Sequence, residues 1–364
     1  MSNYYEIDFL DVESQKSGDA ITVRHVVDRV QRIYVVDGGF QDTGDKLVEH
    51  INKYYDSPDH IDHVVVTHPD GDHAGGLRKV IDKFEISKLW MLRPWIYADE
   101  LIDRFSRFTS VDNLKRRLKE IYPNIAALED IAEERGIQIC EPFQGANIGA
   151  FKVLAPTRER YLDLVVESEK TPEATKDQGI AAEDASKNFY EMMKAKVVAF
   201  ARALWGQENF SDEDTSAENE MSVVQYAHLH GHRILLTGDA GRDALSEAAD
   251  YAHSVGIMLP GIDRFQVPHH GSRRNVSTEV LDRWLGERLA NKPEKGSETF
   301  IAIISAAKDD EHHPRKAVVR SMIHRGAQVL KTKGANLRIP SHNAPSREGW
   351  VTAIPLDYPE EQES

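Results

Sequence analysis

A short run of histidine and aspartate residues carries the strongest chemical signal in this sequence. It reads His68-Pro69-Asp70-Gly71-Asp72-His73 and directly follows the β-branched stretch 64–67. A strand that ends in a tight turn can direct such side chains toward a common centre. Imidazole and carboxylate groups together suit borderline divalent cations. We therefore predict a metal site formed by His68, Asp70, Asp72 and His73.

Strands and helices must position this run. Short apolar runs bounded by Gly, Asp and Pro predict strands, at Glu6–Val12, Ala20–His25, Arg32–Val36, His63–Thr67, Lys88–Leu92, Phe151–Leu154, Ser222–His228, Arg233–Thr237, Arg264–Val267, Phe300–Ser305 and Ala327–Lys331. Helical periodicity lies between them, at Asp45–Tyr55, Leu77–Phe84, Asp243–Val255, Thr278–Leu289 and Ala317–Arg325. We expect residues 1–364 to form a single domain of mixed α/β class, a four-layer αββα sandwich of two packed sheets with helices outside.

Two charged stretches of helical character, residues 97–135 and 157–220, interrupt this pattern. The second includes an acidic loop at 211–216. Solvated helix faces and a flexible connection are the simpler interpretation. The alternative is that these insertions form a lid beside the site or a contact through which chains oligomerise.

Composition limits the partners and the compartment. The formal net charge of −15 would repel nucleic-acid backbones and anionic membranes, so a phosphate substrate must be attracted locally. The single cysteine, Cys140, excludes an intramolecular disulfide and a cysteine-based zinc cluster. The N-terminus lacks the basic start and apolar run of a signal peptide, and the apolar runs are too short to span a bilayer. We therefore expect a cytoplasmic protein without a membrane partner.

The histidine-aspartate run resembles the His-x-His-x-Asp-His signature of the metallo-β-lactamase superfamily, with Asp70 where many members have a second histidine. Other segments are similar, in the same order, to the hydrolase domain of bacterial DNA-uptake competence proteins. These segments are Asp8–Val12 with Gly18-Asp19-Ala20, Val36–Gly39, Leu235–Asp239, Val267–Ser272, and Ile303–Ser305 with His313-Pro314. The resemblance implies the metallo-β-lactamase sandwich, with the two charged stretches as insertions.

The resemblance also implies a two-metal site. His68 and Asp70 would bind the first ion, Asp72 and His73 would bind the second, and Asp239 would bridge the two. A hydroxide held by the ions would be the nucleophile, because paired ions lower the pKa of water and stabilise charge on the attacking and leaving oxygens. Asp72 would also orient this water or receive its proton.

Two points of this assignment stay open in the sequence. Either His269 or His270 would complete the second site. The third histidine of the first site, which most members place before the strand leading to the bridging aspartate, is missing. Asn219 and Ser222 there are similar to an Asn-and-Ser segment of the competence branch. Because carboxylate in place of imidazole favours harder ions, we expect Zn²⁺ or Mn²⁺, one or two ions per chain, with the first bound more weakly.

Nearby histidines and cations have weaker signals. His313, which precedes a proline at a helix start, is a candidate general acid or phosphate contact, because helix N-termini favour anions. An exposed residue at the helix start is the alternative. The candidate substrate-binding residues are Asn219, Ser222, Ser272, Arg273 and Lys316. The histidines at 228, 230 and 232 are expected to be exposed residues of a hairpin.

The leading functional hypothesis is hydrolysis of a phosphodiester, in a nucleotide or a nucleic acid, because a hard metal pair suits phosphoryl chemistry. Hydrolysis of a carbonyl compound, such as a lactam, lactone or thioester, is an alternative, since fold does not decide substrate. The missing histidine-rich first site counts against it. A third hypothesis, from another class, is a weakly catalytic, metal-stabilised protein that binds a partner.

Overall fold

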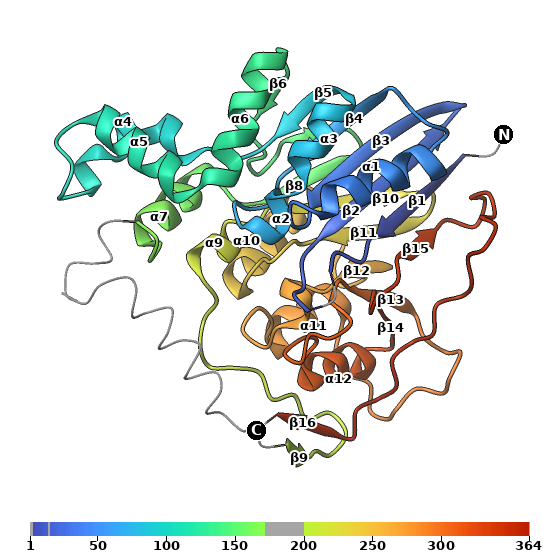
Figure 1. Ribbon diagram of the computed structural model, residues 1–364. Coiled ribbons are helices and arrows are strands. Elements are labelled where there is room, and N and C mark those ends of the chain that lie inside the picture. The colour runs from blue at the N-terminus through green and yellow to red at the C-terminus, as the bar shows by residue number, and fades with distance from the viewer. Residues whose placement is uncertain (1–2, 14, 172–199, 364) are drawn as a thin grey trace.

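A computed structural model describes residues 3–13, 15–171 and 200–363 (Figure 1). Two seven-stranded sheets lie face to face, and helices cover their outer faces. This arrangement confirms the predicted four-layer αββα sandwich. Residues 172–199, in the middle of the second predicted insertion, lie outside the described residues.

The first sheet combines an antiparallel meander with a parallel half. Its strands are, in order across the sheet, β15 (Leu337–Pro340), β1 (Tyr4–Phe9), β2 (Ala20–Val27), β3 (Val30–Gly38), β4 (His60–Val65), β5 (Glu85–Trp90) and β6 (Gln138–Cys140). Strands β1 to β3 are antiparallel, whereas β3 to β6 are parallel. The carboxyl ends of β3 and β4 therefore meet at one edge of the sheet.

The second sheet is also antiparallel on one side and parallel on the other. Its strands are β14 (Ala327–Lys331), β13 (Phe300–Ile304), β12 (Arg264–Gln266), β11 (His232–Leu236), β10 (Val224–Leu229), β8 (Phe151–Ala155) and β7 (Asn147–Ile148). Strands β11 to β14 are parallel. A separate antiparallel pair joins β9 (Phe200–Arg202) to β16 (Glu361–Glu363).

Strand β3 has apolar side chains on both faces of the first sheet. Ile33 and Val35 belong to the cluster between the first sheet and its helices, whereas Tyr34 and Val36 belong to the cluster between the two sheets. Successive side chains of a strand point to opposite faces, and a strand covered on both sides is apolar throughout. This explains why the central strands are continuous apolar runs in the sequence.

Three helices cover each sheet. Those on the first sheet are α1 (Thr43–Tyr54), α3 (Leu77–Lys83) and α6 (Pro123–Arg135), and those on the second are α10 (Arg242–Ser254), α11 (Thr278–Leu285) and α12 (Lys316–His324). Helix α11 stops before the predicted end at Leu289 because Gly286 adopts a φ of 96°. Among the described residues, no helix has the length and apolar character needed to cross a membrane.

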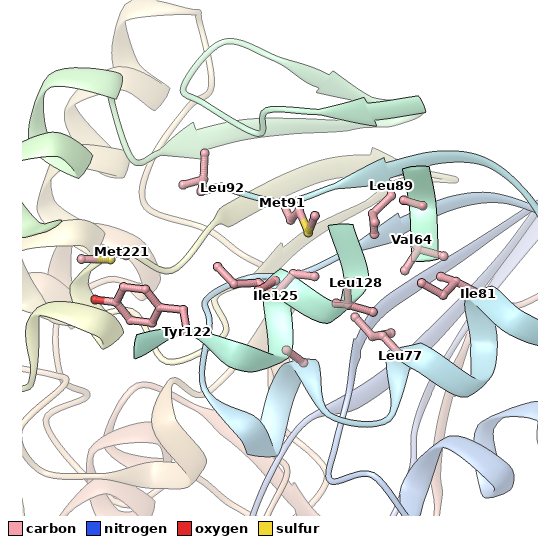
Figure 2. Packing of buried hydrophobic residues seen from close by; sticks show 14 of the residues in the cluster. Val64, Leu77, Ile81, Leu89, Met91, Leu92, Tyr122, Ile125, Leu128 and Met221 are labelled. Carbon is pink, nitrogen blue, oxygen red and sulfur yellow. The ribbon is translucent and has the colours of Figure 1, made fainter. Parts of the chain in front are cut away.

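The first predicted insertion consists mainly of α4 (Ala98–Leu101), α5 (Val111–Ile121) and α6. Helix α6 has a solvated face with the exposed Asp130, Glu133 and Glu134, whereas Ile125 and Leu128 are buried beside Leu77 of α3 and Leu89 of β5 (Figure 2). The second predicted insertion contains α7 (Arg158–Glu167) and α9 (Ala217–Glu220). Tyr122, at the start of α6, donates a hydrogen bond of 3.0 Å to Glu218 of α9, so the two stretches are joined.

Candidate metal centre

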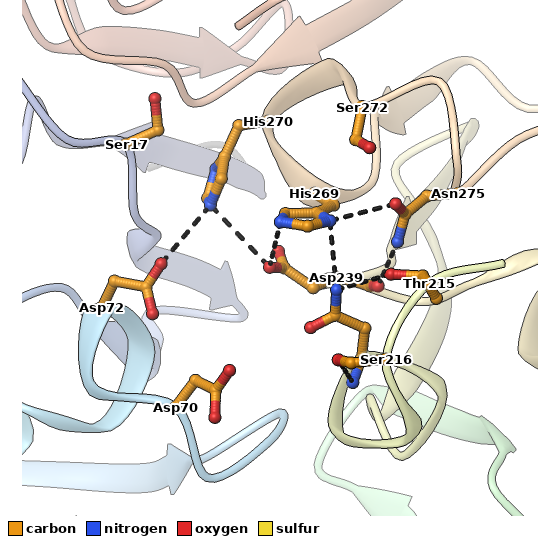
Figure 3. A network of polar contacts seen from close by, with 12 residues as sticks. Ser17, Asp70, Asp72, Thr215, Ser216, Asp239, His269, His270, Ser272 and Asn275 are labelled. Carbon is orange, nitrogen blue, oxygen red and sulfur yellow. Dashed lines mark hydrogen bonds and ion pairs between the residues drawn. The ribbon is translucent and has the colours of Figure 1, made fainter. Parts of the chain in front are cut away.

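The predicted ligands lie at the carboxyl edge of both sheets. The loop after β4 carries His68, and the short helix α2 (Gly71–Ala74) carries Asp72 and His73. Asp239 follows β11, and His269 and His270 follow β12, in the loops at the edge where the parallel strands of the second sheet end. Ligand sites in sheets with parallel strands commonly lie at this edge. Figure 3 shows the two histidines and Asp239 facing Asp72.

Close backbone packing holds the metal loop against its neighbours. A Cβ on Gly18, in the β1–β2 loop, would lie 2.6 Å from the carbonyl oxygen of Asp72. The N–H of Asp19 donates a 3.1 Å hydrogen bond to that carbonyl. On the opposite side, His269 and His270 have φ values of 46° and 55°. Side chains other than glycine adopt this region at a cost, and such conformations concentrate at functional sites.

Four side chains form one part of the site. His73 Nε2 lies 3.3 Å from Asp239 Oδ1 and 3.9 Å from Asp72 Oδ2. His270 Nε2 lies 3.8 Å from Oδ2 of each of these aspartates. Ligand atoms bonded to one tetrahedral Zn²⁺ are about 3.4 Å apart, given bonds of about 2.0–2.1 Å. Asp72, His73 and His270 thus converge closely enough to hold a divalent ion, and Asp239 faces His73 through Oδ1 and His270 through Oδ2.

A second group of ligands shares Asp239. His68 Nε2 lies 3.8 Å from Asp239 Oδ2, and His68, His73 and Asp239 form a convergent group. His269 Nε2 also reaches this carboxylate, at 3.7 Å. The geometry thus favours His270 as the partner of Asp72 and His73, whereas His269 approaches Asp239 and belongs to none of the convergent groups in the described residues. Of the two histidines between which the sequence could not choose, the geometry therefore favours His270 over His269 as a ligand of the second ion.

The hydrogen bonds of the three buried histidines leave the same nitrogen available. Nδ1 of His73 donates to Asp37 Oδ2 at 2.8 Å, and Nδ1 of His270 donates to the Ser305 carbonyl at 2.8 Å. Nδ1 of His68 lies 3.1 Å from Thr67 Oγ1. All three Nε2 atoms are buried without a hydrogen-bond partner in the described part of the chain. Buried polar atoms without partners are costly, so convergent Nε2 lone pairs fit a bound cation.

The charges of the metal-free site attract one another strongly. Burial disfavours the charged carboxylate of Asp239, but His73, His269 and His270 outweigh this and hold the pKa of Asp239 well below its usual range. Burial also opposes a charge on His270, yet Asp239 and Asp72 raise its pKa to about 9. Metal ligation needs neutral imidazole, so binding of an ion would release protons and would weaken as the pH falls.

Sequence reasoning missed two buried carboxylates of the site. Asp37, at the end of β3, accepts hydrogen bonds from the Thr67 N–H at 2.8 Å and the Thr67 hydroxyl at 2.6 Å, as well as from His73. Asp19 accepts from Gln266 at 2.8 Å and converges with Asp239 and His270. Both lie in segments that carry the family resemblance. For Asp37, the available signal was an aspartate directly at the end of an apolar run.

Asp70 lies apart from the convergent groups. Its Oδ1 is 2.6 Å from Nζ of Lys170, and it belongs to none of the histidine-aspartate groups found among the described residues (Figure 3). Its role as a ligand of the first ion therefore stays a prediction.

His313 lies beside the centre, with a partner that the sequence did not indicate. Its ring stacks on His269 with centroids 5.7 Å apart, and its Nδ1 lies 3.2 Å from Asp310 Oδ2. Burial lowers the pKa of His313 to about 4. The ring is thus neutral at pH 7, which favours accepting a hydrogen bond at its free nitrogen over the expected role of general acid.

The predicted polar contacts divide into two sets. Asn219 Nδ2 lies 3.1 Å from His269 Nδ1, and Ser222 Oγ accepts the Asp239 N–H at 3.2 Å, so both support the centre. The buried Ser272 lies near His269, and its Oγ accepts the Arg274 N–H at 3.3 Å (Figure 3).

The predicted cations are engaged elsewhere. Arg273 donates to the Asn209 carbonyl at 3.2 Å, and Lys316 Nζ lies 4.0 Å from Glu361. The expected anion position at the start of α12 is filled by this chain's own Glu363, whose carboxylate accepts the N–H groups of Lys316 and Ala317. The roles of Arg273 and Lys316 in substrate binding therefore stay predictions.

Comparison with known proteins gives a family match for part of the chain. Residues 25–133 match the sequence profile of the metallo-beta-lactamase superfamily. This segment contains Asp37 and the loop from His68 to His73. Members of that superfamily are mostly metal-dependent hydrolases, which typically bind one or two divalent ions.

One solved structure also aligns with much of the chain. It is described as "a putative metallo-beta-lactamase" from Thermotoga maritima, with 13% sequence identity, coverage of 70% of this chain and 87% of that one, and a TM-score of 0.29. The comparison with curated proteins gives no match.

Proposed function

We propose that the protein is a metal-dependent phosphodiesterase that acts on a small phosphate ester, such as a nucleotide or a short nucleic-acid fragment. The observation that carries this proposal is the convergence of Asp72, His73, Asp239 and His270, with Nε2–Oδ distances of 3.3–3.9 Å. A divalent ion bound there would supply Lewis acidity toward phosphoryl oxygens and a lowered pKa for water. The resemblance to a branch of hydrolases linked to DNA supports the phosphate ester.

The donor set supports the choice of metal and of chemistry. Carboxylates contribute two of the four convergent groups, and Asp19 adds a third within the same cluster. Oxygen ligands favour harder ions, and imidazole suits Zn²⁺ and other borderline ions. We propose Mn²⁺ or Zn²⁺ as the resident ion, since both accept a mixed nitrogen and oxygen set.

The chain's own residues define how a substrate would approach. Side chains of His68 and His73 are fully buried, whereas those of Asp72 and His269 are 30% and 29% exposed. A substrate would therefore enter over Asp72 and His269. Asp72 would orient the attacking water, because the effect of burial on its carboxyl group is outweighed by neighbouring His73 and His270, which lower the pKa of that group and keep it ionised. The net charge of −15 favours a small ester over a long polyanion.

We expect release of nitrophenol from bis(p-nitrophenyl) phosphate in the presence of Mn²⁺, and loss of this activity in Asp72→Ala. The reason is that Asp72 serves both as a ligand and as the exposed carboxylate of the site. The rate should be measured with Mn²⁺, Zn²⁺, Ni²⁺ and Mg²⁺ in turn. Asp82→Ala, an exposed position on α3, is the matched control and should retain the wild-type rate.

Two results would contradict the proposal. One is folded, metal-loaded protein without turnover of the phosphodiester with any of the four ions. The other is rapid hydrolysis of a lactam, a lactone or a thioester by a protein that does not hydrolyse the phosphodiester. That result would place the protein among the carbonyl hydrolases.

A further inference from the structure

The contact between Asp70 and Lys170 joins the metal loop to the second predicted insertion. The two residues are 100 positions apart, and Lys170 Nζ lies 2.6 Å from Asp70 Oδ1. Both side chains are partly exposed, at 45% for Lys170 and 30% for Asp70. Asp70 is the carboxylate that the sequence signature assigns to the first metal ion. An ammonium group thus occupies the position beside a predicted metal ligand.

Buried neighbours fix the backbone on which Lys170 stands. Ser168 and Thr171 are 0% and 1% exposed, and the Thr171 hydroxyl donates to the Ser168 carbonyl at 2.7 Å. Ser168 Oγ accepts the Lys170 N–H at 3.1 Å and donates to the buried Glu218 of α9. Lys170 is therefore held at the metal loop by an ordered turn after α7, and its ion pair is more than a chance contact of two surface side chains.

The half of the centre nearest to Asp70 has few ligands of its own. His68 converges with His73 and Asp239, but His73 also converges with Asp72 and His270, and Asp239 also lies 3.8 Å from His270. A second ion would therefore depend on Asp70, or on His269 across Asp239, to complete its coordination. An ion pair that keeps Asp70 from binding metal would therefore lower the affinity of this half for its ion and leave the other half unaffected.

The competing charges set the direction of the effect. A divalent ion and an ammonium group repel each other when both approach one carboxylate. The ion pair with Lys170 must therefore break, or shift, before Asp70 can bind metal. Removing the ammonium removes this competition and leaves Asp70 free to turn toward His68.

We propose that Lys170 is a built-in competitor for the first metal ion, which holds Asp70 in an ion pair and keeps the His68 half of the centre weak. The tight half, formed by Asp72, His73, Asp239 and His270, binds its ion independently of Lys170. At low metal concentration the protein then carries one ion, and the second binds only when it displaces the lysine from Asp70. This inference rests on the proposed function only in requiring a metal centre.

The test is a metal titration that does not depend on turnover. Mn²⁺ binding to metal-free wild type and Lys170→Met should be followed by calorimetry and by the electron paramagnetic resonance signal of free Mn²⁺. We expect the Kd of the weaker ion to fall about 10-fold in Lys170→Met, a typical size for a partner of a ligand, with the Kd of the tighter ion unchanged. Lys170→Arg, which keeps the charge, should bind as wild type does.

Two further variants make the result specific. Arg158→Met removes another exposed cation of the same insertion, which pairs with Glu100, and should leave both dissociation constants unchanged. Asp70→Asn in the Lys170→Met background should cancel the gain. An unchanged weaker site in Lys170→Met, or a gain that survives Asp70→Asn, would overturn the inference while leaving the tight ion and the proposed function intact. Wild type that binds no ion at all would refute both.

Discussion

Replacing Asp239 by Asn should lower the affinity for the tighter ion by at least about 100-fold and abolish hydrolysis at ordinary metal concentrations. The Asp239 carboxylate lies 3.3–3.8 Å from Nε2 of all four histidines of the centre, at positions 68, 73, 269 and 270. An amide there carries no charge and directs N–H groups at lone pairs that would bind the ion. Calorimetric titration with Mn²⁺ or Zn²⁺ measures the loss directly.

The control for this variant is Asp250→Asn. Asp250 lies on the exposed face of α10, where it pairs with Arg283. Circular dichroism of the metal-free proteins should show that both variants fold. A folded Asp239→Asn protein with wild-type affinity would mean that Asp239 is a structural aspartate and that the convergence of the four histidines upon it has no part in metal binding.

Asp37→Asn should lower metal affinity by about 10–100-fold although residue 37 does not belong to the tight ligand set. The native carboxylate accepts the Nδ1–H of His73 and so keeps the Nε2 lone pair of that ring free. An amide N–H facing Nδ1 would move the ring proton to Nε2 and block ligation. Residue 37 has a φ of 58°, a conformation that Asn tolerates, so the backbone should be retained.

Truncation at the same position separates this effect from stability. Asp37 is fully buried and accepts two hydrogen bonds from Thr67. Asp37→Ala should therefore lower the free energy of unfolding by about 3–5 kcal/mol, as measured by guanidinium denaturation of the metal-free protein. Asp62→Asn is the control, because Asp62 accepts the Ile33 N–H at 2.8 Å within the same strand pair but away from the centre. Equal metal affinity in Asp37→Asn and Asp62→Asn would contradict the tautomer argument.

The sequence could predict the layers and most of the side chains that converge at the candidate site because their signals are local. Apolar runs of strand length and helical periodicity specify two sheets and the helices that cover them. The run from His68 to His73 places four potential metal ligands within six residues. A metal site can therefore be predicted there without knowledge of the topology. The end of α11 was placed too late because a single glycine, Gly286, decides it.

The remaining features of the site depend on contacts between distant segments. Asp37 supports His73 only because β3 and β4 are parallel neighbours, and Asp19 joins the centre only because the β1–β2 loop packs on the metal loop. The start of α12 is a further example, because its Lys316 and Ala317 N–H groups are bound by Glu363 from the last strand of the described chain. Contacts of this kind join segments that are far apart in the sequence. The spacing of residues within one segment therefore cannot predict them.

The position of the bound ion tests the central claim most directly. Crystals of the metal-free protein should be soaked in Mn²⁺ or Zn²⁺ and measured at the absorption edge of the metal. We predict an anomalous peak enclosed by Asp72, His73, Asp239 and His270, with a weaker second peak, if present, beside His68. A folded protein that shows no peak among these four residues, or an ion bound only at another histidine cluster such as His25 and His230, would contradict the assignment of this edge of the sandwich as a metal centre.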